Sequence, residues 1–259
     1  MNPLAARLAE ERAVFLLAVQ FLTRLPVRDA GLWSPGRMAA IPRYFPAVGA
    51  LTGTLMAAVF WLAALALPPV LAAIVTVALG LVLTGAFHED GFADACDGLG
   101  GGSTRERALE IMRDSRLGTY GTAGLGLMLA ARIAALAVLP PAAVPVALIA
   151  GQTLSRASAV LAMATSRYVR DHGTAKPVQD GVDRTGAAVV ALSAAAVTAA
   201  AAVWLPPMAL VAGLGGLALG HAAMRRIYER RLGGYTGDCL GAVQQCSEIG
   251  FLIGLVAWL

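Results

Sequence analysis

The chain has 259 residues, of which 58% are hydrophobic and only 14% are charged, and its formal net charge is +4. Its mean hydropathy of +0.70 excludes an ordinary soluble domain and indicates a multi-pass membrane protein. Aromatic residues make up 6% of the chain and there are 29 glycines, so we expect the helices to pack through small side chains.

The first 44 residues precede the first long apolar stretch. Within them, the apolar run 13–22 is too short to cross a bilayer. We predict that this run forms an interfacial or re-entrant helix. Residues 1–44 are therefore interpreted as an N-terminal interfacial segment of a single membrane domain, 1–259.

Apolar stretches long enough for transmembrane helices then follow one another to the end of the chain. The predicted fold class is an all-α polytopic membrane protein, with about seven transmembrane helices and a short N-terminal helix. The predicted spans are residues 45–67, 70–87, 119–139, 144–165, 186–204, 208–223 and 239–259.

The connectors between these spans alternate in character. Three are short, uncharged and contain Pro-Pro pairs, whereas the others hold nearly all the charge. All but two of the 20 Lys and Arg residues lie in the charged connectors or the N-terminal tail; the exceptions are Arg132 and Arg156. The positive-inside rule then predicts that the charged connectors are cytoplasmic and that the C-terminus is extracytoplasmic. The charged connectors are residues 24–44, 88–118, 166–185 and 224–238.

The connector 88–118 begins with an acidic motif. If this part is helical, Asp90, Asp94 and Asp97 are spaced i, i+4 and i+7 and project from one face. Three like charges on one face repel one another, and a hard divalent cation such as Mg²⁺ relieves that repulsion. The alternative interpretation is a solvated acidic loop or helix end.

A run of three glycines, Gly100, Gly101 and Gly102, follows the acidic motif. Ser103 and Glu106 come next in the pattern of a helix-capping box, so the glycines are predicted to lead into a helix. Free backbone N–H groups at such an entry bind phosphate well. Glycines also precede many capped helices that bind nothing, and that alternative remains open.

Basic and acidic residues alternate at the end of the same connector. Arg113 and Arg116 are one turn apart and could contact a diphosphate, and Asp114 could be a further metal ligand. A salt-bridged helix end is the competing interpretation.

The last span carries unusual polar residues. Asp238 lies at its predicted cytoplasmic mouth and is a candidate to complete the metal site. Glu248 lies deeper in the same span, where an unpaired carboxylate is costly. Arg132 and Arg156 are its candidate partners.

Four strings of residues carry a resemblance to a known family. In order and spacing they resemble the cobalamin (5′-phosphate) synthases, also called adenosylcobinamide-GDP ribazoletransferases, from about residue 14 to the C-terminus. The strings are Phe-Leu-Thr-Arg-Leu-Pro-Val at 21–27, Phe-His-Glu-Asp-Gly-Phe-Ala-Asp at 87–94 with Asp-Gly at 97–98, Glu-Ile-Met-Arg-Asp-Ser-Arg-Leu-Gly-Thr at 110–119, and Gly-Tyr-Thr-Gly-Asp at 234–238 with Leu-Gly-Ala at 240–242.

This resemblance implies the last joining step of cobalamin assembly. GDP-activated adenosylcobinamide and α-ribazole, or its 5′-phosphate, would combine while GMP leaves, with Mg²⁺ as cofactor. It also implies a multi-pass protein of the bacterial inner membrane that contacts lipid and has no nucleic-acid partner. The choice between the two ribazole substrates, the number of metal ions and the oligomeric state, a homo-oligomer included, stay open.

The chemistry of the residues, in agreement with the resemblance, suggests a role for each candidate; Glu89 is the exception to the resemblance, since many relatives have leucine there. The metal would bridge the diphosphate, Arg113 or Arg116 would stabilise charge on the departing GMP, and a carboxylate or His88 would accept the proton of the ribazole hydroxyl. The expected catalytic residues are His88, Arg113, Asp114 and Arg116; the expected substrate-binding residues are Arg24, Gly100, Gly101, Gly102 and Thr236; and the expected metal ligands are Glu89, Asp90, Asp94, Asp97 and Asp238.

Two other functions use the same acidic residues. One is a Mg²⁺-linked transporter, although polarity confined to one face favours an enzyme. The other is a lipid-headgroup phosphotransferase, because Asp94-x-x-Asp97-Gly98 resembles the start of the CDP-alcohol phosphotransferase signature. The rest of that signature is missing, so we interpret the likeness as shared chemistry.

Overall fold

The computed structural model describes residues 3–28, 31–170, 178 and 182–259. These residues form helices and loops, and the strand-like feature among them is an isolated parallel bridge between Tyr168 and Tyr235. The predicted all-α class is confirmed. The elements are α1 (Pro3–Leu22), α2 (Pro35–Ala40), the 3-10 helix η1 (Ile41–Tyr44), α3 (Phe45–Ala64), α4 (Pro69–Thr84), α5 (Phe87–Gly101), α6 (Arg105–Ile111), α7 (Thr119–Val138), α8 (Val144–Thr165), α9 (Arg184–Trp204), α10 (Pro207–Leu232) and α11 (Gly237–Trp258).

The helices account for the predicted spans. In the described part of the chain, six helical stretches are long and apolar enough to cross a membrane; the bent pair α4 and α5 passes the same test of length and composition when counted as one broken span or re-entrant loop, which makes seven at most. The first stretch combines α2, η1 and α3 over Pro35–Ala64. Helix α10 continues to Leu232, beyond the predicted end at residue 223.

A bend of 91° separates α4 from α5, and the sequence did not predict it. Gly85 and Ala86 adopt φ angles of +63° and +57°, and the Ala86 N–H donates to the Leu81 carbonyl at 2.9 Å. Left-handed residues with this hydrogen bond end a helix. Because α5 runs at 91° to α4 and carries the acidic motif, we place α5 along the membrane surface, outside the spans.

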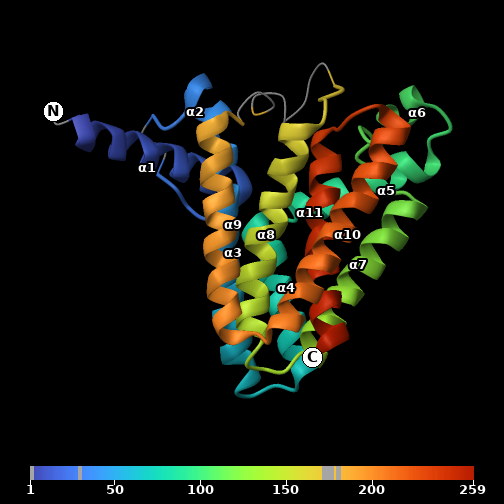
Figure 1. Cartoon of the computed structure of the whole chain (residues 1–259). Helices are drawn as coiled ribbons and strands as arrows, with labels where there is room; N and C mark the ends of the chain where they lie inside the picture. Colours follow the sequence, from blue (N-terminus) through green and yellow to red (C-terminus); the bar gives the residue numbers. More distant parts are fainter. Residues whose placement is uncertain (1–2, 29–30, 171–177, 179–181) are drawn as a thin grey trace.

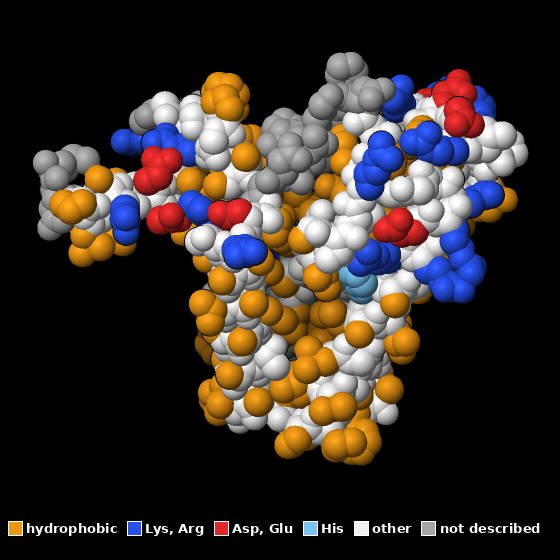
Figure 2. All heavy atoms as spheres, turned by 45° about the horizontal axis from the view of Figure 1, so that its top comes forward, with side chains coloured by type: hydrophobic (Ala, Val, Ile, Leu, Met, Phe, Trp, Pro, Cys, Tyr) orange, Lys and Arg blue, Asp and Glu red, His pale blue; other side chains and the backbone are white. Residues whose placement is uncertain are grey.

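The bundle has two contrasting ends (Figure 1). One end, here called the charged face, carries α2, α5 and α6. The other end, the proline face, carries the connectors 65–68, 139–143 and 205–206 and the C-terminus. Figure 2 shows Arg, Asp and Glu side chains gathered at the charged face, whereas the flank below is covered by hydrophobic and other uncharged side chains.

Small residues bring the helices into close contact, as composition predicted. Gly216 of α10 lies against the backbone of Gly250 of α11, and Gly220 lies against that of Cys246. On the other side of the bundle, Gly53 of α3 faces the backbone of α8, where an added Cβ would lie 2.8 Å from the Ile149 Cα. These contacts leave no room for larger side chains.

Helix α1 is longer than the predicted 13–22. Its polar first half continues the helix, and its apolar second half is buried against the bundle. Two ion pairs tie the polar half to the neighbouring segment: Glu10 to Arg37 at 2.7 Å and Glu11 to Arg43 at 2.8 Å. In Figure 1 α1 projects sideways from the charged end, which fits the interfacial orientation that we predicted.

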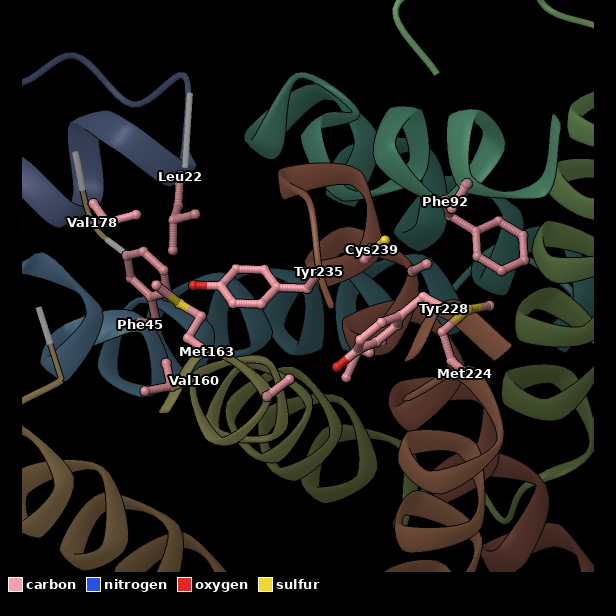
Figure 3. Close-up of a cluster of buried hydrophobic side chains, with 14 of the residues drawn as sticks. Leu22, Phe45, Phe92, Val160, Met163, Val178, Met224, Tyr228, Tyr235 and Cys239 are labelled. Carbon is pink, nitrogen blue, oxygen red and sulfur yellow. The ribbon is translucent and has the colours of Figure 1, made fainter. Parts of the chain in front are cut away.

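A buried apolar cluster lies beneath the charged face (Figure 3). Tyr235, just before α11, points toward Phe45 of α3 and Met163 of α8, while Phe92 connects the cluster to α5. Because the cluster joins residues from several helices, it holds the start of α11 in a fixed position beside α5.

Candidate functional site

Helix α5 turns one face outward and the other into the protein. The acidic motif is helical, which is the condition that the sequence left open, and the helix places Asp90 and Asp94 on the outward side. Asp90 is exposed and Asp94 is half-buried. His88 and Glu89 are buried on the inward side, so adjacent residues of the motif face different surroundings.

Asp97 connects α5 to α7. Its two carboxylate oxygens accept hydrogen bonds from the Gly118 N–H at 2.7 Å and the Gly121 N–H at 2.8 Å, at the first turn of α7. A carboxylate is stabilised at a helix N-terminus. The two glycines let the carboxylate approach, because a Cβ at either position would collide with it. Asp97 therefore fixes where α7 begins relative to the acidic face.

Asp238 lies beside α5 although it is far away in the sequence. The Thr236 hydroxyl caps α11 by accepting the Cys239 N–H at 3.3 Å, and Asp238 follows in the first turn. An added Cβ on Gly91 would lie 3.1 Å from the Asp238 Cα, a tight contact, so the glycine favours this close approach of α5 to α11. Asp238 also pairs with Arg170 at 2.8 Å.

The acidic face is electrostatically strained. Burial, followed by the charges of Asp238 and Asp90, raises the pKa of Asp94 to about 7. Among the described residues, no three Asp, Glu, His or Cys side chains converge into a ready-made metal cage. Mg²⁺ seldom needs one, because it usually binds one or two carboxylates and completes its shell with water and substrate phosphates. The oxygen donors of Asp90, Asp94 and Asp238 fit that mode of binding.

Glu89 does not join the aspartates, contrary to its predicted place among the metal ligands. Its Oε1 lies 3.1 Å from Arg132 Nη1 and accepts a hydrogen bond from Gln245 Nε2 at 3.0 Å. Arg132 is in turn 3.3 Å from Glu248 Oε1, so the predicted pairing of Glu248 with this arginine is confirmed. One helical step of 100° separates Glu89 from Asp90 and turns it toward the bundle interior.

The buried network continues through α8. Gln152 Nε2 donates to Glu248 at 2.8 Å, and Arg156 Nη1 donates to the Gln152 side chain at 2.5 Å and to its carbonyl at 3.1 Å. Arg156 therefore reaches Glu248 through Gln152 and makes no direct ion pair with it. Two arginines and two glutamates balance one another in this network, which reduces the cost of burying charge in a membrane domain.

His88 lies on the network side of α5. Its side chain is buried, it packs edge-on against Phe87 with ring centroids 5.4 Å apart, and it borders a small cavity with Arg156. The imidazole therefore does not face the surface that carries Asp90 and Asp94.

The residues after α6 adopt the salt-bridged arrangement that the sequence left as an alternative. Asp114 and Arg116 form an ion pair at 2.6 Å, and the Arg116 hydrogen bonds lower the pKa of Asp114 to about 2. The Arg116 side chain is 87% exposed. Arg113 instead lines a basic pocket at the charged face.

The glycine run does not form the predicted phosphate loop. Gly100 and Gly101 belong to the last turn of α5, and the Gly102 N–H is used in a hydrogen bond to the Gly98 carbonyl at 2.9 Å. The helix that follows is capped by Thr104, which accepts the Arg107 N–H at 3.2 Å, and not by Ser103. Helical hydrogen bonding therefore occupies backbone N–H groups of the glycine run that were expected to be free for phosphate.

Two further predicted substrate-binding residues have structural contacts. The Arg24 side chain lies over Gly85 at the α4–α5 bend, where an added Cβ on Gly85 would meet the guanidinium. The backbone N–H of Arg24 donates to the Leu83 carbonyl at 2.7 Å. Thr236 is fully buried as the cap of α11. Both residues therefore help to shape the surroundings of the acidic face.

Sequence reasoning missed Arg170. The segment before it is joined to Tyr235 by two backbone hydrogen bonds, from Tyr235 N–H to the Arg167 carbonyl at 2.8 Å and from Val169 N–H to the Tyr235 carbonyl at 3.0 Å. This bridge carries Arg170 to Asp238. No local motif signals such a pairing, because the two segments meet only through the tertiary fold.

Comparisons with known proteins identify the family of the chain. The family model described as cobalamin-5-phosphate synthase matches residues 14–256. An adenosylcobinamide-GDP ribazoletransferase of Leptothrix cholodnii is 44% identical over 97% of this chain and 98% of its own. Proteins of the same name from Vibrio cholerae and Shewanella frigidimarina are 41% and 40% identical, covering 99% and 91% of this chain and 98% and 91% of their own lengths. No solved structure matches the chain. The chain therefore belongs to the cobalamin-5-phosphate synthase family.

Proposed function

We propose that this chain is an adenosylcobinamide-GDP ribazoletransferase, which joins GDP-activated adenosylcobinamide to α-ribazole or its 5′-phosphate and releases GMP. Family membership over nearly the whole chain supports this assignment. The structural observation that carries it is the meeting of Asp90 and Asp94 of α5 with Asp238 of α11 at the charged face. Carboxylates placed at a membrane surface suit a reaction between a large amphiphilic substrate and a soluble one.

The proposed cofactor is Mg²⁺, held by Asp90, Asp94 and Asp238. When bound, the ion would neutralise charge on the diphosphate of the activated corrinoid. Among the expected aspartate ligands, Asp97 differs in that both of its oxygens accept backbone hydrogen bonds. Its proposed role is to hold α7 against α5.

The protein side chains divide the remaining tasks. Arg170 lies against Asp238 and Arg113 lines the adjacent basic pocket, so both are placed to bind phosphate oxygens near the acidic face. Because His88 is buried beneath α5, we propose that a carboxylate of the acidic face accepts the proton of the attacking ribose hydroxyl. Arg116 is highly exposed and paired with Asp114, which leaves Arg113 as the better candidate to stabilise the departing GMP.

We further propose that the charged face is cytoplasmic and that the protein resides in the bacterial inner membrane. The uneven distribution of arginines supports this orientation. Both the GMP that leaves and the ribazole that enters would then exchange with the cytosol.

The direct test is an assay of the purified protein with adenosylcobinamide-GDP, α-ribazole 5′-phosphate and Mg²⁺. We expect equal amounts of GMP and cobamide product. No product from folded protein would contradict the proposal, and Mg²⁺ flux into liposomes without product would favour the transporter alternative.

A further inference from the structure

A basic pocket opens at the charged face beside the acidic residues. It has a volume of about 860 Å³ and lies between α6, the segment 167–170 and the end of α10. Figure 2 shows Arg side chains clustered on the charged part of the surface. Six arginines line the pocket: Arg105, Arg113, Arg167, Arg170, Arg230 and Arg231.

Two of these arginines hold the walls together. Arg105 Nε donates to the Leu232 carbonyl at 2.8 Å, and Arg231 Nη2 donates to the carbonyl of Gly102 at 2.7 Å. These bonds link α10 to α6 and to the end of α5. The pocket is therefore built by specific contacts between elements and is not a loose cluster of surface charges.

Arg170 gives the pocket a buried cationic wall. Its side chain is only 10% exposed, and its buried Nε has no hydrogen-bond partner among the described residues. A buried donor without a partner is costly, so Arg170 adds unsatisfied hydrogen-bonding capacity to this wall. The acid in the lining, Glu229, is engaged by the Ser166 hydroxyl at 2.5 Å and lies 3.7 Å from Arg225.

The position of the segment 167–170 is fixed by the backbone bridge to Tyr235. Gly234 lies against the Arg167 carbonyl so closely that an added Cβ would overlap it. The rings of Tyr168 and Tyr235 also pack with centroids 5.4 Å apart. The pocket thus comes preorganised, with Arg170 connecting it to Asp238 of the acidic face.

We propose that this pocket is the subsite for a substrate phosphate group in the reaction proposed above. Several guanidinium groups around one cavity match the charge and the acceptor oxygens of a phosphate. In that reaction the phosphate comes from one of two sources, the 5′-phosphate of α-ribazole 5′-phosphate or the guanine nucleotide. The inference rests on the proposed function, but the binding test below needs no turnover.

The test measures equilibrium binding to purified full-length protein in detergent without Mg²⁺. Two ligand pairs differ only in the phosphate: α-ribazole 5′-phosphate against α-ribazole, and GMP against guanosine. The variants are Arg167→Gln and Arg230→Gln, both exposed in the pocket lining, and the control is Arg226→Gln, an exposed arginine one turn earlier on α10 that lies outside the lining. None of the three replaces Arg113 or Arg170.

We expect the wild-type protein to prefer the phosphorylated member of at least one pair. Each pocket variant should reduce that preference about tenfold, as expected for one charge-assisted hydrogen bond, whereas Arg226→Gln should leave it unchanged. Loss confined to the ribazole pair assigns the pocket to the ribazole 5′-phosphate, and loss confined to the GMP pair assigns it to the nucleotide.

Three results would overturn the inference. They are an unchanged preference in both pocket variants, an equal loss in Arg226→Gln, or displacement of the phosphorylated ligand by phosphatidylglycerol, which would assign the pocket to a lipid headgroup. If wild-type protein still turns over in these cases, the proposed function stands. Absence of both binding and turnover would contradict the two together.

Discussion

Asp94 is a residue of the acidic face whose ionised form is clearly disfavoured by its surroundings. It is half-buried, and the charges of Asp238 and Asp90 add to the effect of burial, so that its pKa rises to about 7. A carboxyl group with a raised pKa destabilises the folded protein whenever it is ionised. Ligand binding at this face would remove a penalty that the free protein carries.

This strain predicts a pH dependence of stability for Asp94. Between its ordinary pKa of 3.8 and about 7, the folded protein binds more protons at this residue than the unfolded chain does. Stability should therefore fall as the pH rises through that window. With EDTA present, the thermal unfolding midpoint of wild-type protein in detergent should drop more between about pH 5 and pH 8 than that of Asp94→Asn. Equal slopes for the two proteins would refute the raised pKa.

Glu89 and Arg132 should behave as structural residues. Arg132→Met leaves Glu89 and Glu248 buried without their cation and should cost about 3–5 kcal/mol of folding free energy. Glu89→Gln keeps a hydrogen-bonding side chain and should cost less. Thermal unfolding in detergent tests this prediction: Arg132→Met should unfold at a lower temperature than Glu89→Gln.

A Mg²⁺ titration of turnover separates this role from metal binding. In Glu89→Gln the Mg²⁺ concentration for half activity should match that of the wild type. A clear increase in that Mg²⁺ concentration would show that Glu89 is a metal ligand after all.

Glycines set the distance between α10 and α11. A Cβ on Gly250 would overlap the Gly216 backbone, whereas a Cβ on Gly126 of α7 meets nothing within 4 Å. Gly250→Ala should therefore destabilise the protein by about 1–3 kcal/mol. Gly126→Ala should leave stability unchanged or raise it by about 0.5–1 kcal/mol, because alanine favours a helix. The thermal unfolding midpoints of the two variants test this expectation. Equal midpoints would show that the contact between Gly250 and Gly216 does not limit helix packing.

At the element scale, hydropathy and spacing predicted the helices well. Apolar length identified the spans, and the i, i+4, i+7 spacing of Asp90, Asp94 and Asp97 was compatible with the helix that the structure shows. The bend at Gly85 and Ala86 could not be predicted, because a glycine followed by alanine also occurs inside straight helices. Because the bend was not predicted, the sequence also could not show that Glu89 points into the bundle or that Gly100 and Gly101 belong to a helix.

At the scale of the whole molecule, the two faces, the approach of Asp238 to the acidic motif and the pairing of Glu248 with Arg132 were predictable, but the detailed contacts around Asp238 were not. Alternating connectors separated the charged face from the proline face. The close contact of Asp238 with Gly91 and its pairing with Arg170 depend instead on how α5, α11 and the segment 167–170 pack together. Residue patterns within one helix carry no information about those pairings.

The two faces predict a labelling pattern in intact membranes. With the native cysteines replaced by alanine, cysteines introduced at Leu67, Ala142 and Met208 lie at the proline face, and one at Ser103 lies at the charged face. A membrane-impermeant maleimide should label the first three from outside the cell and Ser103→Cys only after the membrane is opened. Labelling of both sets from the same side would contradict the topology.

The Mg²⁺ dependence of GMP release tests the acidic site most directly. Asp238→Ala should raise the Mg²⁺ concentration needed for half activity. Asp94→Asn should lose several kcal/mol of transition-state stabilisation, so its turnover should fall at least about a hundredfold. The control Glu106→Gln, an exposed acid of α6, should behave as wild type. Wild-type turnover and unchanged Mg²⁺ dependence in Asp94→Asn and Asp238→Ala would show that these carboxylates do not form the site.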